Sequence, residues 1–181
     1  MLDMIVRYLH EALVPFRLSS YPSEEHLPTA GHATPPYAIA VETRILRAGD
    51  KLVLACHPTG VQIDLAAISN ELGAPVIEAA PEDLPGILQG KQGPPPPLGH
   101  LFGMPLIVDE EVTRHTSIVF QPFGDSDYFE VPYDDFARLE QPRVASFARS
   151  GVLPETTETP REEEAAAAQA PRQEEAAASA R

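Results

Sequence analysis

Four consecutive prolines, Pro94 to Pro97, interrupt the middle of this 181-residue chain. Proline fixes its own φ angle and has no backbone N–H, so this run fits neither the interior of a helix nor a central strand. Gly93 precedes the run, Gly99 follows it shortly after, and an apolar segment typical of a buried strand begins at Met104. A flexible linker does not usually enter a core so abruptly. The pattern predicts a stiff loop whose exposed backbone can form one wall of a binding site.

Length and composition predict one soluble domain with a sizeable core, because 43% of the residues are hydrophobic. No apolar run reaches the roughly 18 residues of a membrane span. The first 13 residues have amphipathic spacing and an early Asp3, which is unlike a signal peptide. The single cysteine, Cys56, excludes an intrachain disulfide and is typical of a reducing compartment. We therefore expect a cytoplasmic protein.

The charge balance limits what the chain can bind unaided. Thirteen basic residues stand against 27 acidic ones, for a formal net charge of -14. Proteins bind phosphates largely through Lys and Arg that displace counterions. The chain alone should therefore bind nucleic acid weakly, although a small patch could still hold one nucleotide end.

The composition changes near Ser150. Residues 151–181 contain one Val, one Leu and no aromatic residue, and Pro171 interrupts their Ala and Glu runs. Such a segment cannot bury enough apolar surface to offset the entropy of ordering it. The sequence therefore predicts a domain over residues 1–150 and a disordered acidic tail over 151–181. The tail carries a net charge of -4, which leaves -10 for the domain, and it could contact a basic protein partner.

Hydrophobic spacing predicts a mixture of strands and helices within residues 1–150. The expected helices cover residues 2–13, 63–73, 81–88 and 133–139, and the expected strands cover 16–18, 38–46, 51–58, 75–79, 104–109, 116–120 and 128–132, with a loop over 21–36. Asp64 is the expected N-cap of its helix and Gly73 its C-terminal stop. The irregular alternation favours a mixed α/β (α+β) fold over a regular doubly wound one.

Three motifs resemble the YbaK and prolyl-tRNA-synthetase-associated editing-domain family. They are Pro58-Thr59-Gly60 leading to Ile63-Asp64-Leu65, Gly93 followed by the four prolines, and residues 98–103 leading into 105–109. The resemblance covers roughly residues 37–140. It implies a mixed, partly barrel-like sheet surrounded by short helices. It also implies hydrolysis of the ester bond of mischarged aminoacyl-tRNA, no metal or other cofactor, and possible delivery of the substrate by an aminoacyl-tRNA synthetase.

The same resemblance assigns roles around the proline loop. The backbone amides of Gly93 and Gly99 would stabilise the oxyanion that forms when water attacks the ester carbonyl. Pro96 and Pro97 would form the wall against which the aminoacyl group lies. The substrate's own ribose hydroxyl could assist. His100 could bind substrate or orient a water, or it could instead donate to loop carbonyls.

Glu42 departs from the family pattern. Family members usually carry a lysine followed by threonine on this strand, and here Glu42 precedes Thr43. Glu42 could pair with the α-ammonium of an aminoacyl group or act as base for a water. Arg44 lies two residues on, points to the same face, and could supply the missing positive charge. Glu42 and Arg44 could equally form an ordinary surface pair. If the lost lysine is essential, the chain is a binding module that has kept the fold without the chemistry.

The remaining candidate residues carry weaker signals. Cys56 and His57 are adjacent on a strand and point to opposite faces, so Cys56 is expected in the core rather than in a catalytic dyad. His26 and His32 lie near two glutamates without a recognised metal-ligand spacing. Thr43 has a hydroxyl but no evident base beside it, and it is assigned to substrate binding. Asp109 is expected to make local hydrogen bonds at the end of its strand.

Overall fold

The computed structural model describes residues 1–20, 38–124 and 126–149. Predictions for the loop over 21–36, for His26 and His32, and for the tail over 151–181 lie outside the described residues. Within the described part, the helices are α1 (Leu2–Glu11), α2 (Leu65–Leu72), α3 (Gly99–Phe102) and α4 (Tyr133–Glu140), with short 3₁₀ turns η2 (Pro81–Asp83), η3 (Val112–Arg114) and η4 (Pro122–Gly124). The strands are β1 (Arg17–Ser20), β2 (Ala38–Ala48), β3 (Lys51–Pro58), β4 (Gln62–Ile63), β5 (Val76–Glu78), β6 (Leu106–Asp109), β7 (Ser117–Phe120), β8 (Asp127–Pro132), β9 (Arg143–Ala145) and β10 (Ala148–Arg149).

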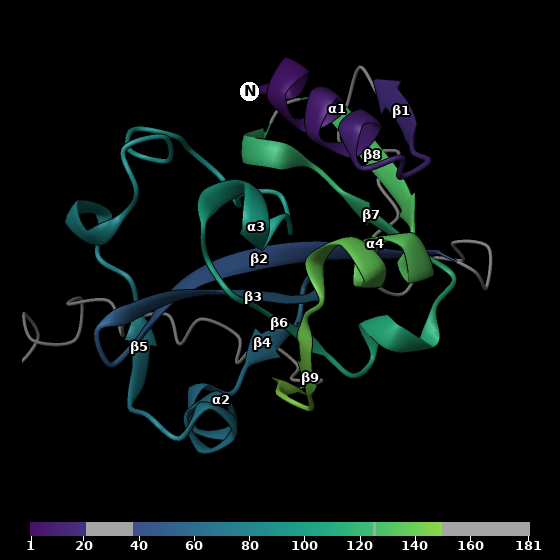
Figure 1. The fold of residues 1–181 in the computed structure, drawn as a ribbon. Helices are drawn as coiled ribbons and strands as arrows, with labels where there is room; N and C mark the ends of the chain where they lie inside the picture. The colour runs from purple at the N-terminus through teal and green to yellow at the C-terminus, as the bar shows by residue number, and fades with distance from the viewer. Residues whose placement is uncertain (21–37, 125, 150–181) are drawn as a thin grey trace, which may run out of the picture. The chain divides into compact units, whose positions relative to one another are not determined.

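A mixed eight-stranded sheet organises the fold (Figure 1), which confirms the predicted mixed α+β class. Its strand order is β1-β8-β7-β2-β3-β6-β9, and β5 adds to β2 off this path. The predicted hairpin lies at its centre, where β2 and β3 pair antiparallel from Val41 opposite Pro58 to Ala48 opposite Lys51. The neighbours β7 and β6 run parallel to the hairpin strands that they join. The small β4 and β10 pair separately.

The two faces of the hairpin enter two different hydrophobic clusters, as the period-two alternation of a strand requires. On β3, Leu54 and Cys56 pack into the cluster that also holds α1, α3 and α4, whereas Val53 and Ala55 pack into the cluster of Ile68 on α2. Cys56 is fully buried, as expected. The proline loop therefore lies on the side of the sheet that carries the larger cluster, because α3 follows it directly.

Local sequence signals account for the helix ends that were predicted correctly. Asp64 caps α2 by accepting from the backbone N–H groups of Ala66 and Ala67. Gly73 ends the helix with a φ of 67°, a conformation that glycine adopts at little cost.

Several boundaries differ from the prediction. Helix α1 ends at Glu11, and Leu13 is 83% exposed with a φ of 56°, so Leu13 does not belong to the buried face. The helix expected over 81–88 is only the 3₁₀ turn η2. Pro85 explains this, because the residue before a proline is pushed to extended backbone and Leu84 has a ψ of 143°. The elements β4, β9, β10 and α3 were not predicted.

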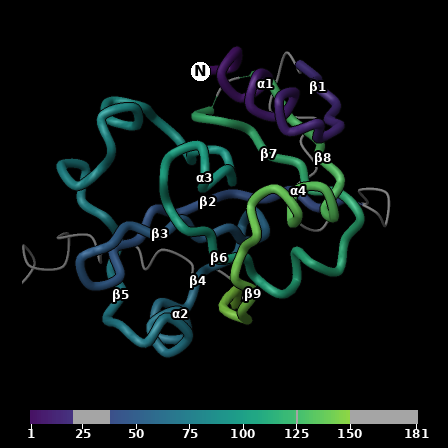
Figure 2. The backbone as a smooth tube through the Cα atoms, viewed as in Figure 1, coloured from purple at the N-terminus to yellow at the C-terminus, as the bar shows by residue number. Residues whose placement is uncertain are grey.

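The long connection between β5 and α3 leaves the sheet and returns to it (Figure 2). It carries η2 and then the proline loop, residues 93–97. None of the helices in the described part of the chain has the length and hydrophobicity needed to cross a membrane.

Candidate functional site

The centre of β2 has one edge without a strand partner among the described residues. On that edge β7 pairs with residues 38–40 and β5 pairs with residues 46–48. The other edge pairs with β3 from Val41 to Ala48. Residues 41–45 therefore border a gap in the sheet, in which the Ile45 carbonyl accepts from the Ala79 backbone N–H at 3.0 Å. Peptide groups at such an unpaired edge can bind a ligand or another segment.

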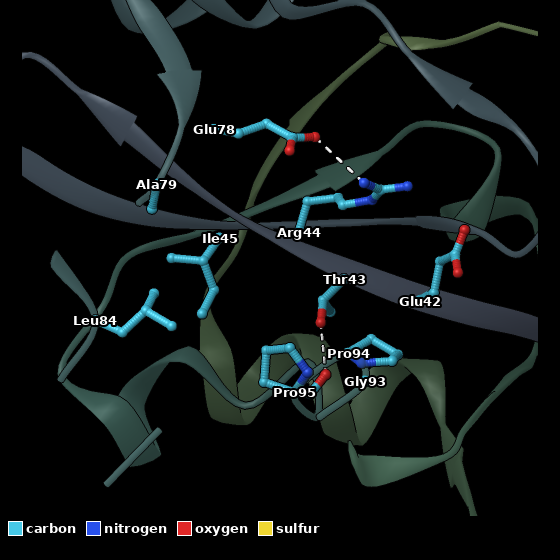
Figure 3. A pocket seen from close by; sticks show the side chains of 10 residues that line it. All are labelled: Glu42, Thr43, Arg44, Ile45, Glu78, Ala79, Leu84, Gly93, Pro94 and Pro95. Atoms are coloured by element: carbon cyan, nitrogen blue, oxygen red, sulfur yellow. Dashed lines mark hydrogen bonds and ion pairs between the residues drawn. The ribbon is translucent and has the colours of Figure 1, made fainter. Parts of the chain in front are cut away.

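A cavity of about 350 Å³ opens at this gap (Figure 3). The residues that line it are Glu42, Thr43, Arg44 and Ile45 of β2, Glu78 and Ala79 at the end of β5, Leu84, and Gly93, Pro94 and Pro95 of the proline loop. Glu42 and Gly93, which come from distant parts of the sequence, thus border one cavity. Ile45, Glu78, Ala79 and Leu84 were not predicted to lie there, and Pro94 and Pro95 belong to the loop that was expected to form a wall.

One part of the cavity is charged. The Arg44 guanidinium makes an ion pair with Glu78, with 3.2 Å between Nη1 and Oε1, and both side chains are exposed. Arg44 is therefore already matched by a carboxylate and does not supply an unopposed positive charge in place of a lysine at position 42. With Glu42 included, the three charged side chains sum to -1, which favours a cationic ligand group.

The opposite part of the cavity is apolar. Ile45 and Leu84 point toward one another and toward Pro95 in the close-up view (Figure 3). Thr43 lies between this part and the charged part, and its hydroxyl donates to the carbonyl of Pro95 at 2.5 Å. Thr43 is only 3% exposed, so its hydroxyl holds the loop rather than facing solvent.

The proline loop is held in place by its carbonyls. Besides the bond from Thr43, the backbone N–H of Phe123 donates to the carbonyl of Pro94 at 2.8 Å. Gly93 has a φ of 80°, and a Cβ there would come within 2.9 Å of the Gly124 nitrogen and the Phe123 carbonyl carbon. Glycine is therefore required at position 93 both by its backbone conformation and by the close approach of a second loop.

The structure does not bring all the predicted residues to the cavity. Pro96 and Pro97 are buried and are not among the residues that line the cavity. Gly99 is also buried, and a Cβ on it would lie 2.5 Å from the carbonyl oxygen of Met104. Pro94 and Pro95 occupy the wall positions instead, because the chain turns into α3 immediately after the run.

His100 contacts α4 and not the cavity. Its Nδ1–H donates to the carbonyl of Leu139 at 3.1 Å, and its backbone N–H donates to Oε2 of Glu140 at 2.9 Å. Glu140 is almost fully buried, and burial raises the pKa of its carboxyl group, although the His100 and Gly99 amides and the Tyr8 hydroxyl act in the opposite direction. The contact from His100 to a carbonyl of α4 replaces the expected contact to loop carbonyls.

His57 lies opposite Glu42 in the hairpin register and is fully buried. Its Nδ1–H donates to the Pro58 carbonyl at 3.0 Å, and the same nitrogen is 3.9 Å from Oε1 of Glu42. Its Nε2 has no hydrogen-bond partner among the described residues. Burial lowers the pKa of His57, and Arg44 lowers it further, against the raising effects of the Pro58 carbonyl, Glu42 and Asp109. The imidazole is therefore neutral, and its contact with Glu42 is not an ion pair.

Asp109 has a structural role, as expected, but only one of its three hydrogen bonds is local. Its Oδ2 accepts from the backbone N–H groups of Phe147 and Ala148 at 2.7 and 2.6 Å, and its Oδ1 accepts from that of Glu111 at 2.9 Å. The carboxylate ties the end of β6 to the last described strands.

Comparison with solved structures supports the fold. A candidate trans-editing enzyme for prolyl tRNA synthetase is 16% identical, with a TM-score of 0.63 over 81% of this chain and 96% of that one. A hypothetical protein is 13% identical, with a TM-score of 0.61 over 81% of this chain and 99% of that one. At such identities the likeness establishes the fold alone.

A candidate signal transduction protein from Marinobacter aquaeolei VT8 is longer than this chain. It is 19% identical, with a TM-score of 0.64, and the alignment covers 81% of this chain but only 30% of that protein. No curated protein matches the sequence.

The sequence itself identifies the family. Residues 29–139, more than half of the chain, match the aminoacyl-tRNA editing domain. This range contains both walls of the cavity, from Glu42 on β2 to Pro95 in the proline loop. The chain belongs to the aminoacyl-tRNA editing domain family.

Proposed function

We propose that this chain is a deacylase that hydrolyses the ester bond between a wrongly attached amino acid and its tRNA. The observation that carries the proposal is the single cavity shared by Glu42 and the proline loop. Its volume of about 350 Å³ lies near the lower end of the range of small-molecule sites. That size suits an aminoacyl group and the sugar edge that carries it, with the rest of the tRNA outside.

Water attacks the ester carbonyl in this proposal, and the tRNA ribose oxygen leaves. Of the two glycines expected to stabilise the oxyanion, Gly93 borders the cavity and Gly99 does not. The backbone of Gly93 and the open edge of β2 are therefore the available sources of peptide N–H donors for the developing charge. The neighbouring hydroxyl of the substrate's ribose assists the attack, which accounts for the lack of a Ser, Cys or His nucleophile among the described residues that line the cavity.

Glu42 anchors the α-ammonium of the aminoacyl group in this proposal. The charges of Glu42, Glu78 and Arg44 sum to -1, and an unpaired carboxylate attracts a cation more strongly as water is excluded. Ile45, Leu84 and Pro95 then contact the amino-acid side chain. Rejection of larger side chains by such a surface amounts to roughly 1–3 kcal/mol per methylene.

Because the domain is acidic, we expect it to bind free tRNA weakly. An aminoacyl-tRNA synthetase is the proposed partner that delivers the substrate. A cytoplasmic location agrees with this partner.

A deacylation assay tests the proposal directly. The full chain is incubated with a panel of tRNAs charged with cognate and non-cognate amino acids, with and without the matching synthetase. We expect at least one mischarged tRNA to lose its amino acid well above the rate in buffer, with correctly charged tRNA spared. Rates equal to buffer across the panel, with and without synthetase, would contradict the proposal.

The second candidate is a binding module without chemistry, and the Arg44–Glu78 ion pair favours it because Arg44 does not replace a lysine at position 42. This candidate predicts that Glu42→Lys creates hydrolysis that the natural chain lacks. It is excluded if the natural chain is active and Glu42→Ala abolishes that activity.

A further inference from the structure

A buried carboxylate joins three helices beside the proline loop. Glu140, at the end of α4, is 3% exposed. Its Oε1 accepts a hydrogen bond from the Tyr8 hydroxyl of α1 at 2.8 Å, and its Oε2 accepts one from the His100 backbone N–H at the start of α3 at 2.9 Å. A carboxylate with so little access to water depends on such partners, because leaving one of its oxygens unpaired costs free energy.

The start of α3 is also the end of the proline loop. The N–H of Leu98 donates to the Pro96 carbonyl at 2.8 Å, and Gly99 begins the helix immediately afterwards. Prolines cannot donate backbone hydrogen bonds, so the loop depends on donors from outside and on the elements at its two ends. Thr43 and Phe123 supply donors to Pro95 and Pro94. Glu140 fixes the other end through His100.

Tyr8 lies well outside residues 29–139, the range that matches the editing-domain family, whereas Glu140 directly follows that range at the end of α4. Tyr8 comes from α1, whose Ile5 and Leu9 pack in the same cluster as Leu98 and Phe102. Helix α1 therefore presents a single polar contact, the Tyr8 hydroxyl, to the carboxylate that holds α3. Its other contacts with this cluster are apolar and do not specify one position of α3 as a directional hydrogen bond does.

We propose that Tyr8 and Glu140 form a clamp that positions the proline loop against β2, so that helix α1, which lies outside the range that matches the family, helps to set the shape of the cavity. The proposal rests on the deacylase function for its catalytic consequence, but its structural claim stands apart. Tyr8 and Glu140 are positioning residues, because neither lines the cavity and they act on it through α3. Burial of Glu140 makes the clamp sensitive to the loss of either partner.

Hydrogen exchange measured by NMR on the full chain tests the structural claim. The Phe123 amide is the reporter, since it donates to the Pro94 carbonyl and becomes free when the loop moves away. Tyr8→Phe removes only the hydroxyl. The matched control is Tyr133→Phe, because Tyr133 is another partly buried tyrosine in the same cluster. The Ile68 amide lies in α2, on the other side of the sheet, and donates to the backbone carbonyl of Asp64. Its exchange reports global unfolding.

Tyr8→Phe should accelerate exchange at the Phe123 and His100 amides by about tenfold, as expected for the loss of one hydrogen bond to a charged group. In Tyr8→Phe, the exchange rate of the Ile68 amide should stay within about threefold of the wild-type rate. In Tyr133→Phe, the exchange rate of the Phe123 amide should also stay within about threefold of the wild-type rate. Glu140→Gln, which keeps the shape and can pair with both partners, should stay close to wild type. Equal acceleration at Phe123 and Ile68, or no acceleration at Phe123, would overturn the clamp.

The activity measurement separates failure of the clamp from failure of the proposed function. If the wild type deacylates, Tyr8→Phe should raise KM and lower kcat/KM more than kcat, and Glu140→Gln should retain most of the wild-type kcat/KM. Deacylation that is unaffected by Tyr8→Phe would contradict the clamp and leave the deacylase proposal standing. A wild type that does not deacylate contradicts the proposed function, while selective exchange at Phe123 still supports the clamp.

Discussion

The Thr43 hydroxyl donates to the carbonyl of Pro95 at 2.5 Å, and this bond ties the centre of β2 to the proline loop. The contact joins residues 52 positions apart across a buried region. It assigns the strand threonine a function in holding the wall of the cavity, and the contact of Thr43 with substrate stays a prediction. The β2 side and the proline-loop side of the cavity are thus joined by this hydrogen bond, and the cavity opens beside it.

Removing the Thr43 hydroxyl should loosen the wall. Thr43→Val keeps the branched shape but leaves the Pro95 carbonyl without this donor, which should lower the free energy of unfolding by about 1–3 kcal/mol. Urea unfolding measures that change. Deacylation should fall at least about tenfold, since a wall displaced by a fraction of an ångström misplaces the ester. Thr43→Ser keeps the donor and should retain most of the rate, and similar rates for the two variants would contradict the role of the hydroxyl.

Gly93 should tolerate no side chain. Gly93→Ala combines a φ of 80° with a Cβ placed 2.9 Å from backbone atoms of Phe123 and Gly124. Gly90→Ala is a matched control, with a φ of 73° and open space around its Cβ. The control should lose roughly 1–2 kcal/mol of stability from backbone strain alone. Gly93→Ala should lose at least about 1 kcal/mol more, because the added atom must displace backbone. Equal losses of stability in the two variants, measured by thermal or urea unfolding, would show that Phe123 and Gly124 do not restrict the space at Gly93.

Glu42 should contribute mainly to substrate binding. Glu42→Gln removes the charge that the α-ammonium is proposed to meet, so KM should rise while kcat changes little. The test compares esters of an amino acid with esters of its N-acetylated form, which lacks the cation. The variant should lose the preference for the free amino group that the wild type shows. A fall in kcat with unchanged KM would instead make Glu42 the base that activates water.

Stability should decline in acid because His57 is buried in its neutral form. The pKa of His57 is lowered in the folded chain from the ordinary value of 6.5. The unfolded chain therefore takes up the proton first, so this contribution to stability is complete above pH 6.5 and is lost as the pH falls toward the lower folded pKa. Urea unfolding at pH 7.5, 6.5 and 5.5 should show the decline.

His57→Asn should be less stable at pH 7.5 but should show a smaller decline between pH 7.5 and 5.5. His10→Gln changes an exposed histidine on α1 and should decline as the wild type does. The same slope in His57→Asn and wild type would mean that another group causes the loss in acid.

Signals that are local in the sequence predicted the elements around the cavity well. The β2–β3 hairpin follows from two apolar runs and a tight turn, and the register that places Glu42 opposite His57 follows from that turn. The glycine and proline spacing predicted a stiff loop and placed Gly93 at the cavity. Asp64 and Gly73 marked the ends of α2 because caps are encoded within a few residues.

The rest depends on contacts that no local pattern encodes. Glu78 reaches the cavity only because the three-residue strand β5 pairs with the end of β2, and such a short run carries little signal of its partner. Pro96, Pro97 and Gly99 were expected at the cavity because they belong to one motif, yet the chain turns into α3 and buries them. Tyr8 and Glu140 are 132 positions apart and look like ordinary polar residues of amphipathic helices in the sequence.

Filling the cavity is the most direct test that the ester is hydrolysed there. Ala79 lines the cavity, so the ring of Ala79→Phe should occupy the space of the aminoacyl group. Ala66→Phe adds the same ring to an exposed position of α2 and serves as the control. Deacylation of a mischarged tRNA should fall at least about a hundredfold in Ala79→Phe, equivalent to roughly 2.7 kcal/mol of lost transition-state stabilisation, and should stay at the wild-type rate in Ala66→Phe. A folded Ala79→Phe variant that deacylates as fast as wild type would contradict the assignment of this cavity as the active site.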